Sequence, residues 1–113
     1  MPADSAAVIT HSVEDEVWVI RITGSLDHDN AELLGEALSH PDAPRTVVDL
    51  SRTEFADSTF LHVLLQAQRQ HDGQGRRLVV AGPFHTIVRR LFEVTGTEGY
   101  FTLAEDVPSA LRV

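Results

Sequence analysis

The chain has 113 residues, of which 42% are hydrophobic and 23% charged, as expected for one small globular domain. Its formal net charge of −8 argues against general binding to nucleic acid or to an anionic membrane, because both require basic patches. Cysteine is absent, which excludes disulfides, thiolate catalysis and cysteine-based zinc sites. The sequence shows no signal peptide and no apolar run near the ~18 residues that span a bilayer, so we expect a cytoplasmic protein.

Two strands are expected at the beginning of the chain. Residues 6–13 and 17–23 are rich in β-branched side chains, which favour strands. The acidic residues 14–16 between them predict a hairpin turn, and Gly24 is expected to end the second strand.

A helix and a buried strand are expected next. Asp29 or Asn30 can cap the helix, whose apolar side chains fall at helical spacing: Leu33, Leu34, Ala37 and Leu38. Pro41 and Pro44 mark the following loop. Residues 46–50, with the sequence TVVDL, form a short apolar run between polar residues and predict a buried strand.

A second helix is expected to begin at Ser58 or Thr59 and to end at about Gln70. The sequence HDGQG at residues 71–75 interrupts the helical pattern. The helix presents an apolar stripe with further apolar residues beside it: Leu61, Leu64, Leu65 and Gln68, then Phe60, Val63 and Ala67. Residues 77–82, RLVVAG, predict another buried strand.

The last part of the chain predicts a helix, a short strand and a final helical turn. Pro83 suits the first turn of the third helix and Gly96 its end, with an apolar face between them: Ile87, Val88, Leu91 and Phe92. Residues 100–103 predict the last strand. Asp106 or Ser109 is expected to open the final turn.

The expected order of elements is β-β-α-β-α-β-α-β-α. Short apolar strands that alternate with helices imply an α/β fold with a mostly parallel central sheet, an N-terminal hairpin and about four covering helices. The sequence has no internal repeat, low-complexity tract or linker. We therefore expect a single domain over residues 1–113, with its core at about 6–112.

Asp57, Ser58 and His62 are the residue types of a nucleophilic triad. A triad needs the acid on the far side of the imidazole and an oxyanion hole beyond the nucleophile. Three residues on one helical turn can hardly provide this, and the sequence has no G-x-S-x-G elbow. A hydrolase is therefore a distant alternative.

Motifs for metal or phosphate binding are weak in this sequence. The six histidines are scattered and form no H-E-x-x-H or comparable ligand pair. The stretch Asp27-His28-Asp29 could hold a metal, but we favour a polar loop that caps the first helix. No glycine-rich loop lies between a strand and a helix, so we expect neither a metal nor a cofactor.

Two hydroxyl side chains, Ser58 and Thr59, follow Asp57 at the expected start of the second helix. Asp57 or Ser58 is a good N-cap, worth ~1 kcal/mol. A cap does not explain why Thr, a mediocre helix former, follows it. The start of a helix also tolerates a phosphate, because free N–H groups and the helix dipole favour negative charge there. The residues alone leave two hypotheses open, a phosphorylation switch and a simple cap.

Five segments of the sequence, in this order, are similar to the motifs of one protein family. GSLDHDNA at residues 24–31 is similar to the family's G-E-L-D segment. VVDLSRTEFADSTFL at residues 47–61 is similar to its central strand and D-S-[ST]-G-L motif. Three further segments match the C-terminal pattern: LVVAGP at 78–83, VRRLFEVTG at 88–96 and SAL at 109–111. With these motifs the chain resembles the STAS domains, and within them the bacterial anti-sigma factor antagonists.

The resemblance implies a switch. An unphosphorylated antagonist of this kind binds an anti-sigma factor that is also a serine-protein kinase, and a sigma factor is released. The kinase, using ATP and magnesium, phosphorylates the hydroxyl at the third place of D-S-[ST]-G, which is Thr59 here, with Ser58 as second choice. A PP2C-type phosphatase reverses the reaction. The protein itself would not be an enzyme, and its partner-binding residues would be Asp27, Asp57, Ser58, Thr59, Phe60 and His62.

Two residues depart from the family motifs. Phe60 stands where the family has Gly, and it could obstruct the kinase, anchor a different partner or extend the core. Ser25 stands where Glu is usual, which weakens the inference that the loop around Asp27 contacts the partner.

An alternative function within the same family is a regulatory subunit that docks on the ATPase of a lipid-transporting ABC system. The loss of the family Gly at Phe60 makes such constitutive docking conceivable. In either case we expect a monomer or a weak dimer, because the edge strand of the N-terminal hairpin could pair with a second copy.

Overall fold

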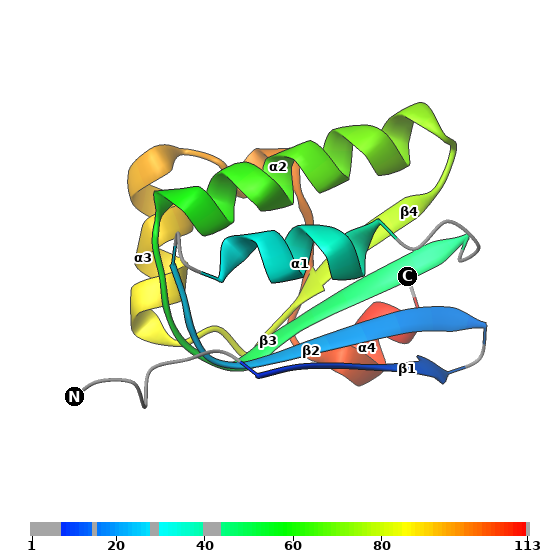
Figure 1. Ribbon diagram of the computed structural model, residues 1–113, viewed down its shortest axis with the longest axis horizontal. Helices are drawn as coiled ribbons and strands as arrows, with labels where there is room; N and C mark the ends of the chain where they lie inside the picture. Colours follow the sequence, from blue (N-terminus) through cyan, green and yellow to red (C-terminus); the bar gives the residue numbers. More distant parts are fainter. Residues whose placement is uncertain (1–7, 15, 28–29, 40–43, 113) are drawn as a thin grey trace.

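The structure, a computed structural model, describes residues 8–14, 16–27, 30–39 and 44–112 (Figure 1). Its strands are β1 (Val8–Glu14), β2 (Val17–Leu26), β3 (Arg45–Ala56), β4 (Arg77–Ala81) and β5 (Thr102–Ala104). Its helices are α1 (Ala31–Leu38), α2 (Ser58–Gly73), α3 (Thr86–Thr95) and α4 (Val107–Leu111). The predicted order of elements is confirmed, and a short 3-10 turn, η2 (Glu98–Tyr100), is added before the last strand.

The strands form one sheet in the order β1-β2-β3-β4-β5. β1 runs antiparallel to β2, and the other neighbouring strands are parallel. The prediction of an α/β fold with a mostly parallel sheet and an N-terminal hairpin is confirmed. Parallel strands end at the same edge of a sheet, so the segments that follow β2, β3, β4 and β5 share one edge.

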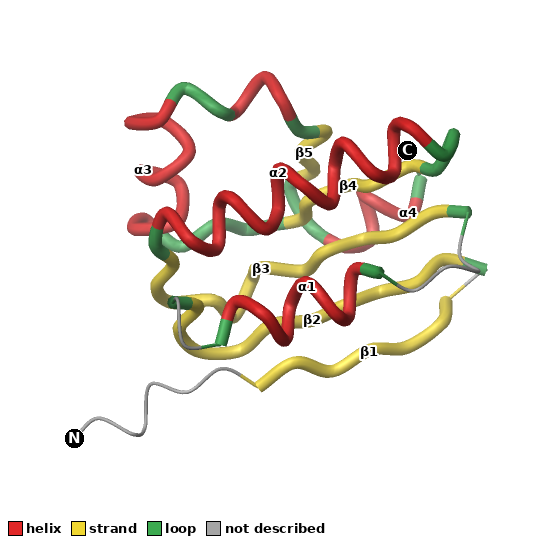
Figure 2. Tube along the Cα trace, turned by 45° about the horizontal axis from the view of Figure 1, so that its top comes forward, coloured by secondary structure: helices red, strands yellow, loops and turns green. Residues whose placement is uncertain are grey.

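The helices cover both faces of this sheet (Figures 1 and 2). α1, α2 and α3 pack on one face and form the larger core, whereas α4 packs on the opposite face. Alternation along β2 supplies both cores, with Trp18, Ile20 and Ile22 towards the first and Val17 and Val19 towards the second. Among the described helices, none combines the length and apolar character that a membrane span requires.

β2 and β3 are both longer than the sequence predicted. Gly24 does not end β2, which continues to Leu26. β3 likewise continues past its predicted end at Leu50 to Ala56. Their register shifts twice, each time with an additional residue in β3, and Gly24, with a φ of 105°, lies at the second shift. Such bulges bend a strand and break the alternation from which strands are predicted.

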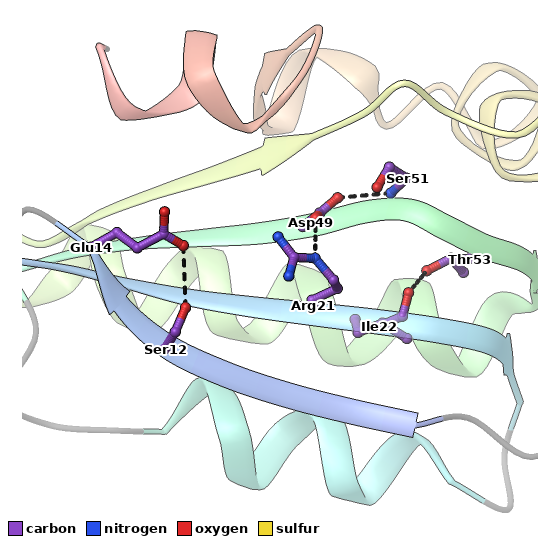
Figure 3. Close-up of polar contacts among 7 residues, drawn as sticks. All are labelled: Ser12, Glu14, Arg21, Ile22, Asp49, Ser51 and Thr53. Atoms are coloured by element: carbon purple, nitrogen blue, oxygen red, sulfur yellow. Dashed lines mark hydrogen bonds and ion pairs between the residues drawn. The ribbon is translucent and has the colours of Figure 1, made fainter.

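Polar contacts hold β2 and β3 together at these shifts (Figure 3). Nε of Arg21 donates to the carboxylate of Asp49 at 2.8 Å, and Asp49 also accepts the backbone N–H of Ser51 at 2.9 Å. The hydroxyl of the buried Thr53 donates to the carbonyl of Ile22 at 2.9 Å. These contacts fix the course of β3 towards its last residues, from which α2 begins.

In the second half of the chain, three boundaries differ from the prediction by two residues or more. α2 continues to Gly73, because a glycine inside a helix costs only ~1 kcal/mol. α3 begins at Thr86 and not at Pro83, since the backbone of the N-cap residue His85 is extended. Tyr100 belongs to η2, and the last strand starts after it.

Two helix ends were predicted correctly from cap residues. Gly96 ends α3 in the left-handed conformation, with a φ of 67°. Asp106 caps α4 and accepts the N–H of Ser109 at 2.8 Å. Three other predictions fall outside the described residues: the first two residues of the segment 6–13, Asp29 as a cap and Pro41 in the loop.

Candidate functional site

Asp57 caps α2. Its backbone is extended, and its Oδ1 accepts the N–H of Thr59 at 2.9 Å and that of Phe60 at 3.2 Å. One carboxylate therefore satisfies two free N–H groups of the helix and places its charge at the positive end of the helix dipole. Of the two predicted caps, Asp57 and Ser58, the structure selects Asp57.

Ser58 and Thr59 are the first two residues of α2. Ser58 is exposed and Thr59 is half-buried. Within the described part of the chain, no hydrogen bond engages either hydroxyl, whereas the backbone N–H of Thr59 is held by Asp57. The backbone at Thr59 is thus fixed, and its hydroxyl is free of competing hydrogen bonds.

Phe60 belongs to the core and not to the surface. Its side chain is 0% exposed and lies in the larger core cluster with residues of α1, α2, α3 and the sheet. Of the three roles considered for Phe60, extension of the core is the correct one. Because the ring is fully buried, Phe60 does not belong to the exposed surface around Thr59. A ring directed into the core also leaves the outer side of Thr59 open.

The loop after β2 lies beside the start of α2. Leu26 pairs with Ala56 at the ends of the two strands, and the N–H of Asp57 donates to the carbonyl of Leu26 at 3.2 Å. Asp27 therefore follows β2 at the point where Asp57 follows β3. The structure brings these two acidic residues to the same edge of the sheet.

The side chain of Asn30 organises this loop. This role was not predicted from the sequence. The Nδ2 of Asn30 donates to the carbonyl of Ser25 at 2.8 Å, and its Oδ1 accepts the N–H of Asp27 at 2.9 Å. Asn30 stands at the N-cap of α1 but makes no side-chain hydrogen bond to that helix. The spacing of Asp27 and Asn30 was a usable signal, since Asn side chains often bond to backbone a few residues away. His28 and Asp29 lie outside the described residues.

His62 is exposed on α2, one turn after Ser58. No hydrogen bond among the described residues joins His62 to Ser58, and the Oδ1 of Asp57 is engaged by the N–H groups of the helix. The three side chains are therefore not arranged as a nucleophilic triad. In the described segments there is also no cluster of three or more His, Asp or Glu side chains that could hold a metal ion.

Comparison with known protein families finds one match over most of the chain. The family described as "Mlab, STAS domain" matches residues 9–105. The matched range contains the first three helices, all five strands except the first residue of β1, and the whole start of α2.

Solved structures with the same fold include several anti-sigma factor antagonists. One from Mycobacterium paratuberculosis is 25% identical, with a TM-score of 0.88, over 99% of this chain and 97% of that chain. The anti-sigma factor antagonist SpoIIAA in its unphosphorylated form is 23% identical, with a TM-score of 0.74, over 93% and 95% of the two chains. The Bacillus cell fate determinant SpoIIAA in its phosphorylated form is 21% identical, with a TM-score of 0.70, over 93% and 98%. The two SpoIIAA structures show the shared fold.

Proposed function

Because the chain belongs to the STAS domain family, we propose that it is an anti-sigma factor antagonist. When unphosphorylated, it binds an anti-sigma factor that is also a serine-protein kinase, and a sigma factor is released in the cytoplasm. The likeness to the antagonist from Mycobacterium paratuberculosis, which extends over nearly the full length of both chains, supports this role. The observation that carries the proposal is the hydroxyl of Thr59, free of hydrogen bonds within the described residues, on a backbone that Asp57 fixes.

Phosphorylation of Thr59 switches binding off. The Oγ1 of Thr59 attacks the γ-phosphorus of ATP in the kinase, its bond to phosphorus forms, the bond to ADP breaks, and the hydroxyl proton passes to the kinase. The new phosphate is tolerated at the start of α2 because the helix dipole favours negative charge there. It is not tolerated in the complex, where it would be buried without a partner, and each ~1.4 kcal/mol of that cost lowers the affinity about tenfold.

The partner contacts the surface around Thr59, which comprises Asp27, Asp57, Ser58, Thr59 and His62. Ser58 and His62 are exposed, and the other three are half-buried. Ser58 is the second choice for the modified hydroxyl, since it also stands in the first turn of α2. A PP2C-type phosphatase removes the phosphate and restores binding.

The test is a pull-down from native lysate with the wild-type protein, Thr59→Ala and Thr59→Glu, with Ser58→Ala as the matched control. Bound proteins and phosphorylated residues are identified by mass spectrometry. We expect a kinase-like anti-sigma factor to bind all variants except Thr59→Glu, and phosphate to be found on Thr59. Phosphate on Ser58, with Thr59→Glu still bound, would move the switch to Ser58.

The second candidate is constitutive docking on the ATPase of a lipid-transporting ABC system. Its support was the replacement of the family Gly by Phe60. Because Phe60 is buried in the core, the replacement leaves the outer side of Thr59 open and favours the switch over constitutive binding. Capture of a transporter ATPase by all four proteins, without phosphate on any of them, would replace the first proposal by the second.

A further inference from the structure

β3 extends beyond its neighbour β4. The last pair between these strands is Asp49↔Ala81, whereas the pairing of β3 with β2 continues to Leu26↔Ala56. Figures 1 and 2 show the ends of β2 and β3 continuing side by side past β4, with β3 leading to the start of α2. At this edge the sheet thus ends in a two-stranded extension, formed by β2 and β3, that carries the proposed binding surface.

Phe55 is the large apolar side chain that this extension exposes. Ala56, the next residue, and Thr53, two residues earlier, are buried, whereas Phe55 is 42% exposed and pairs with Ser25 of β2. Phe60, directly after Thr59, is thus directed inward, and Phe55, four residues before Thr59, is exposed. A single exposed apolar residue is common on proteins, so its position must decide what it does.

The position of Phe55 is rigid relative to Thr59. Phe55 comes two residues before Asp57, whose N–H is bound to the carbonyl of Leu26 and whose carboxylate holds the N–H of Thr59. The buried Thr53 is tied to β2 on the other side of Phe55. An aromatic side chain on a fixed backbone loses little conformational entropy when it binds, and aromatic residues dominate the binding energy of most interfaces.

The charged residues closest to Phe55 along β3 and at the same end of the sheet are mostly acidic. Glu54 is exposed and Asp57 and Asp27 are half-buried, whereas the basic residue nearest in the sequence is the exposed Arg52. The whole chain carries a formal charge of −8. An exposed aromatic ring on an acidic chain, with more acidic than basic residues near it in the sequence, fits an apolar pocket with a basic rim.

From this arrangement we infer that Phe55 is the aromatic anchor of the complex with the anti-sigma factor. The partner receives the ring in an apolar pocket bordered by Lys or Arg side chains. The inference rests on the proposed function, because it names a contact residue for the same partner, the anti-sigma factor.

The experiment measures the dissociation constant for the purified anti-sigma kinase of the same organism with the wild-type protein, Phe55→Ala and Phe55→Leu. The matched control is Tyr100→Ala, because Tyr100 is also aromatic and 68% exposed but lies on η2, against the second half of α2. We expect Phe55→Ala to weaken binding about tenfold or more, Phe55→Leu to weaken it less, and Tyr100→Ala to stay within about twofold. Binding of the wild type should also weaken as salt is added, because the basic rim faces carboxylates.

The outcomes separate the inference from the proposed function. If the wild type does not bind the kinase, the proposed function fails and the inference falls with it. If the wild type binds and Thr59→Glu does not, but Phe55→Ala binds like the wild type, the function stands and the inference is wrong. Equal losses for Phe55→Ala and Tyr100→Ala would also overturn it. Sedimentation of the free protein provides one more check, since a dimer that Phe55→Ala abolishes would make a second copy the occupant.

Discussion

Asp57 belongs to the proposed binding surface and also caps α2, and two substitutions test its role as the cap. Asp57→Ala removes the acceptor for the N–H groups of Thr59 and Phe60, so we expect a loss of about 1 kcal/mol in the free energy of unfolding. Asp57→Asn keeps an acceptor of the same geometry and should retain most of that stability. Urea denaturation of the three proteins measures both effects. Equal stability of Asp57→Ala and the wild type would show that the cap is not needed.

Truncation of Phe60 and of Phe55 should change the stability by very different amounts. Phe60→Ala leaves a cavity in the core and is expected to cost about 3–5 kcal/mol, whereas Phe60→Leu should cost less. Phe55→Ala removes a ring that is partly in water and should change the stability by a small fraction of this amount. Thermal or urea unfolding compares them. A Phe55→Ala protein as unstable as Phe60→Ala would mean that the ring of Phe55 is packed inside.

The role of a single residue was predictable from the sequence where its hydrogen-bond partner is close along the chain. The caps Asp57 and Asp106 bond to N–H groups two or three residues away, so the local pattern contains the whole interaction. The burial of Phe60 was one of three open possibilities, because it depends on how α2 lies on the sheet. The exposure of Phe55 was not predicted, since the strand that carries it was predicted only as far as Leu50.

At the scale of elements, the extension of β2 and β3 is what positions the candidate site. The apolar run TVVDL predicted β3 only as far as Leu50, because the following residues are polar and break the alternation at two bulges. Beyond Asp49, β3 pairs with β2 but no longer with β4, and the polar residues 51, 52 and 54 are exposed there. The local sequence therefore predicts the part of β3 that lies within the sheet. It does not predict the extension, because the extension depends on pairing with β2, which is distant along the chain.

Thr53 offers a test of this element. Thr53→Val keeps the shape of the side chain and removes the hydroxyl that donates to the carbonyl of Ile22, so we expect a loss of about 1–2 kcal/mol. Hydrogen exchange of the amides at Asp57 and Thr59 should become faster, because the extension that carries them is held less firmly. Thr53→Ser keeps the hydroxyl and serves as the control. Unchanged exchange in Thr53→Val would mean that the backbone ladder alone fixes the extension.

At the scale of the whole molecule, His71 connects α2 to the sheet in the interior. It is 1% exposed, its Nδ1 donates to the carbonyl of Ala67 at 2.7 Å, and its Nε2 lies 3.1 Å from the hydroxyl of Thr46 in β3. Since the Nδ1 proton is used by Ala67, the neutral ring accepts a hydrogen bond from Thr46 through Nε2. Burial lowers the pKa of His71 below its ordinary value of 6.5. The hydrogen bond to Ala67 partly opposes this shift, and the charges of Arg76 and Asp72 have smaller effects, which lower and raise the pKa respectively.

The lowered pKa of His71 makes the stability of the fold depend on pH. Below pH 6.5 the unfolded chain binds a proton that the folded protein does not, so stability is present above this pH and is lost as the pH falls. One such proton gives a slope of at most about 1.4 kcal/mol per pH unit. The hydrogen bond from Ser109 lowers the pKa of Asp106 below 3.8, so its own contribution is lost only in more acidic solution.

Urea denaturation between pH 7.5 and pH 5 tests the contribution of His71, by comparison of the wild type with histidine variants. We expect the free energy of unfolding of the wild type to fall as the pH is lowered over this range. The His71→Gln protein should be less stable than the wild type at pH 7.5, but its free energy of unfolding should fall less. The control is His62→Gln, which alters an exposed histidine on the same helix and should keep the slope of the wild type. If His62→Gln flattened the slope and His71→Gln did not, the coupling between pH and stability would lie at the surface of α2, beside Thr59, and not at the buried contact between α2 and β3.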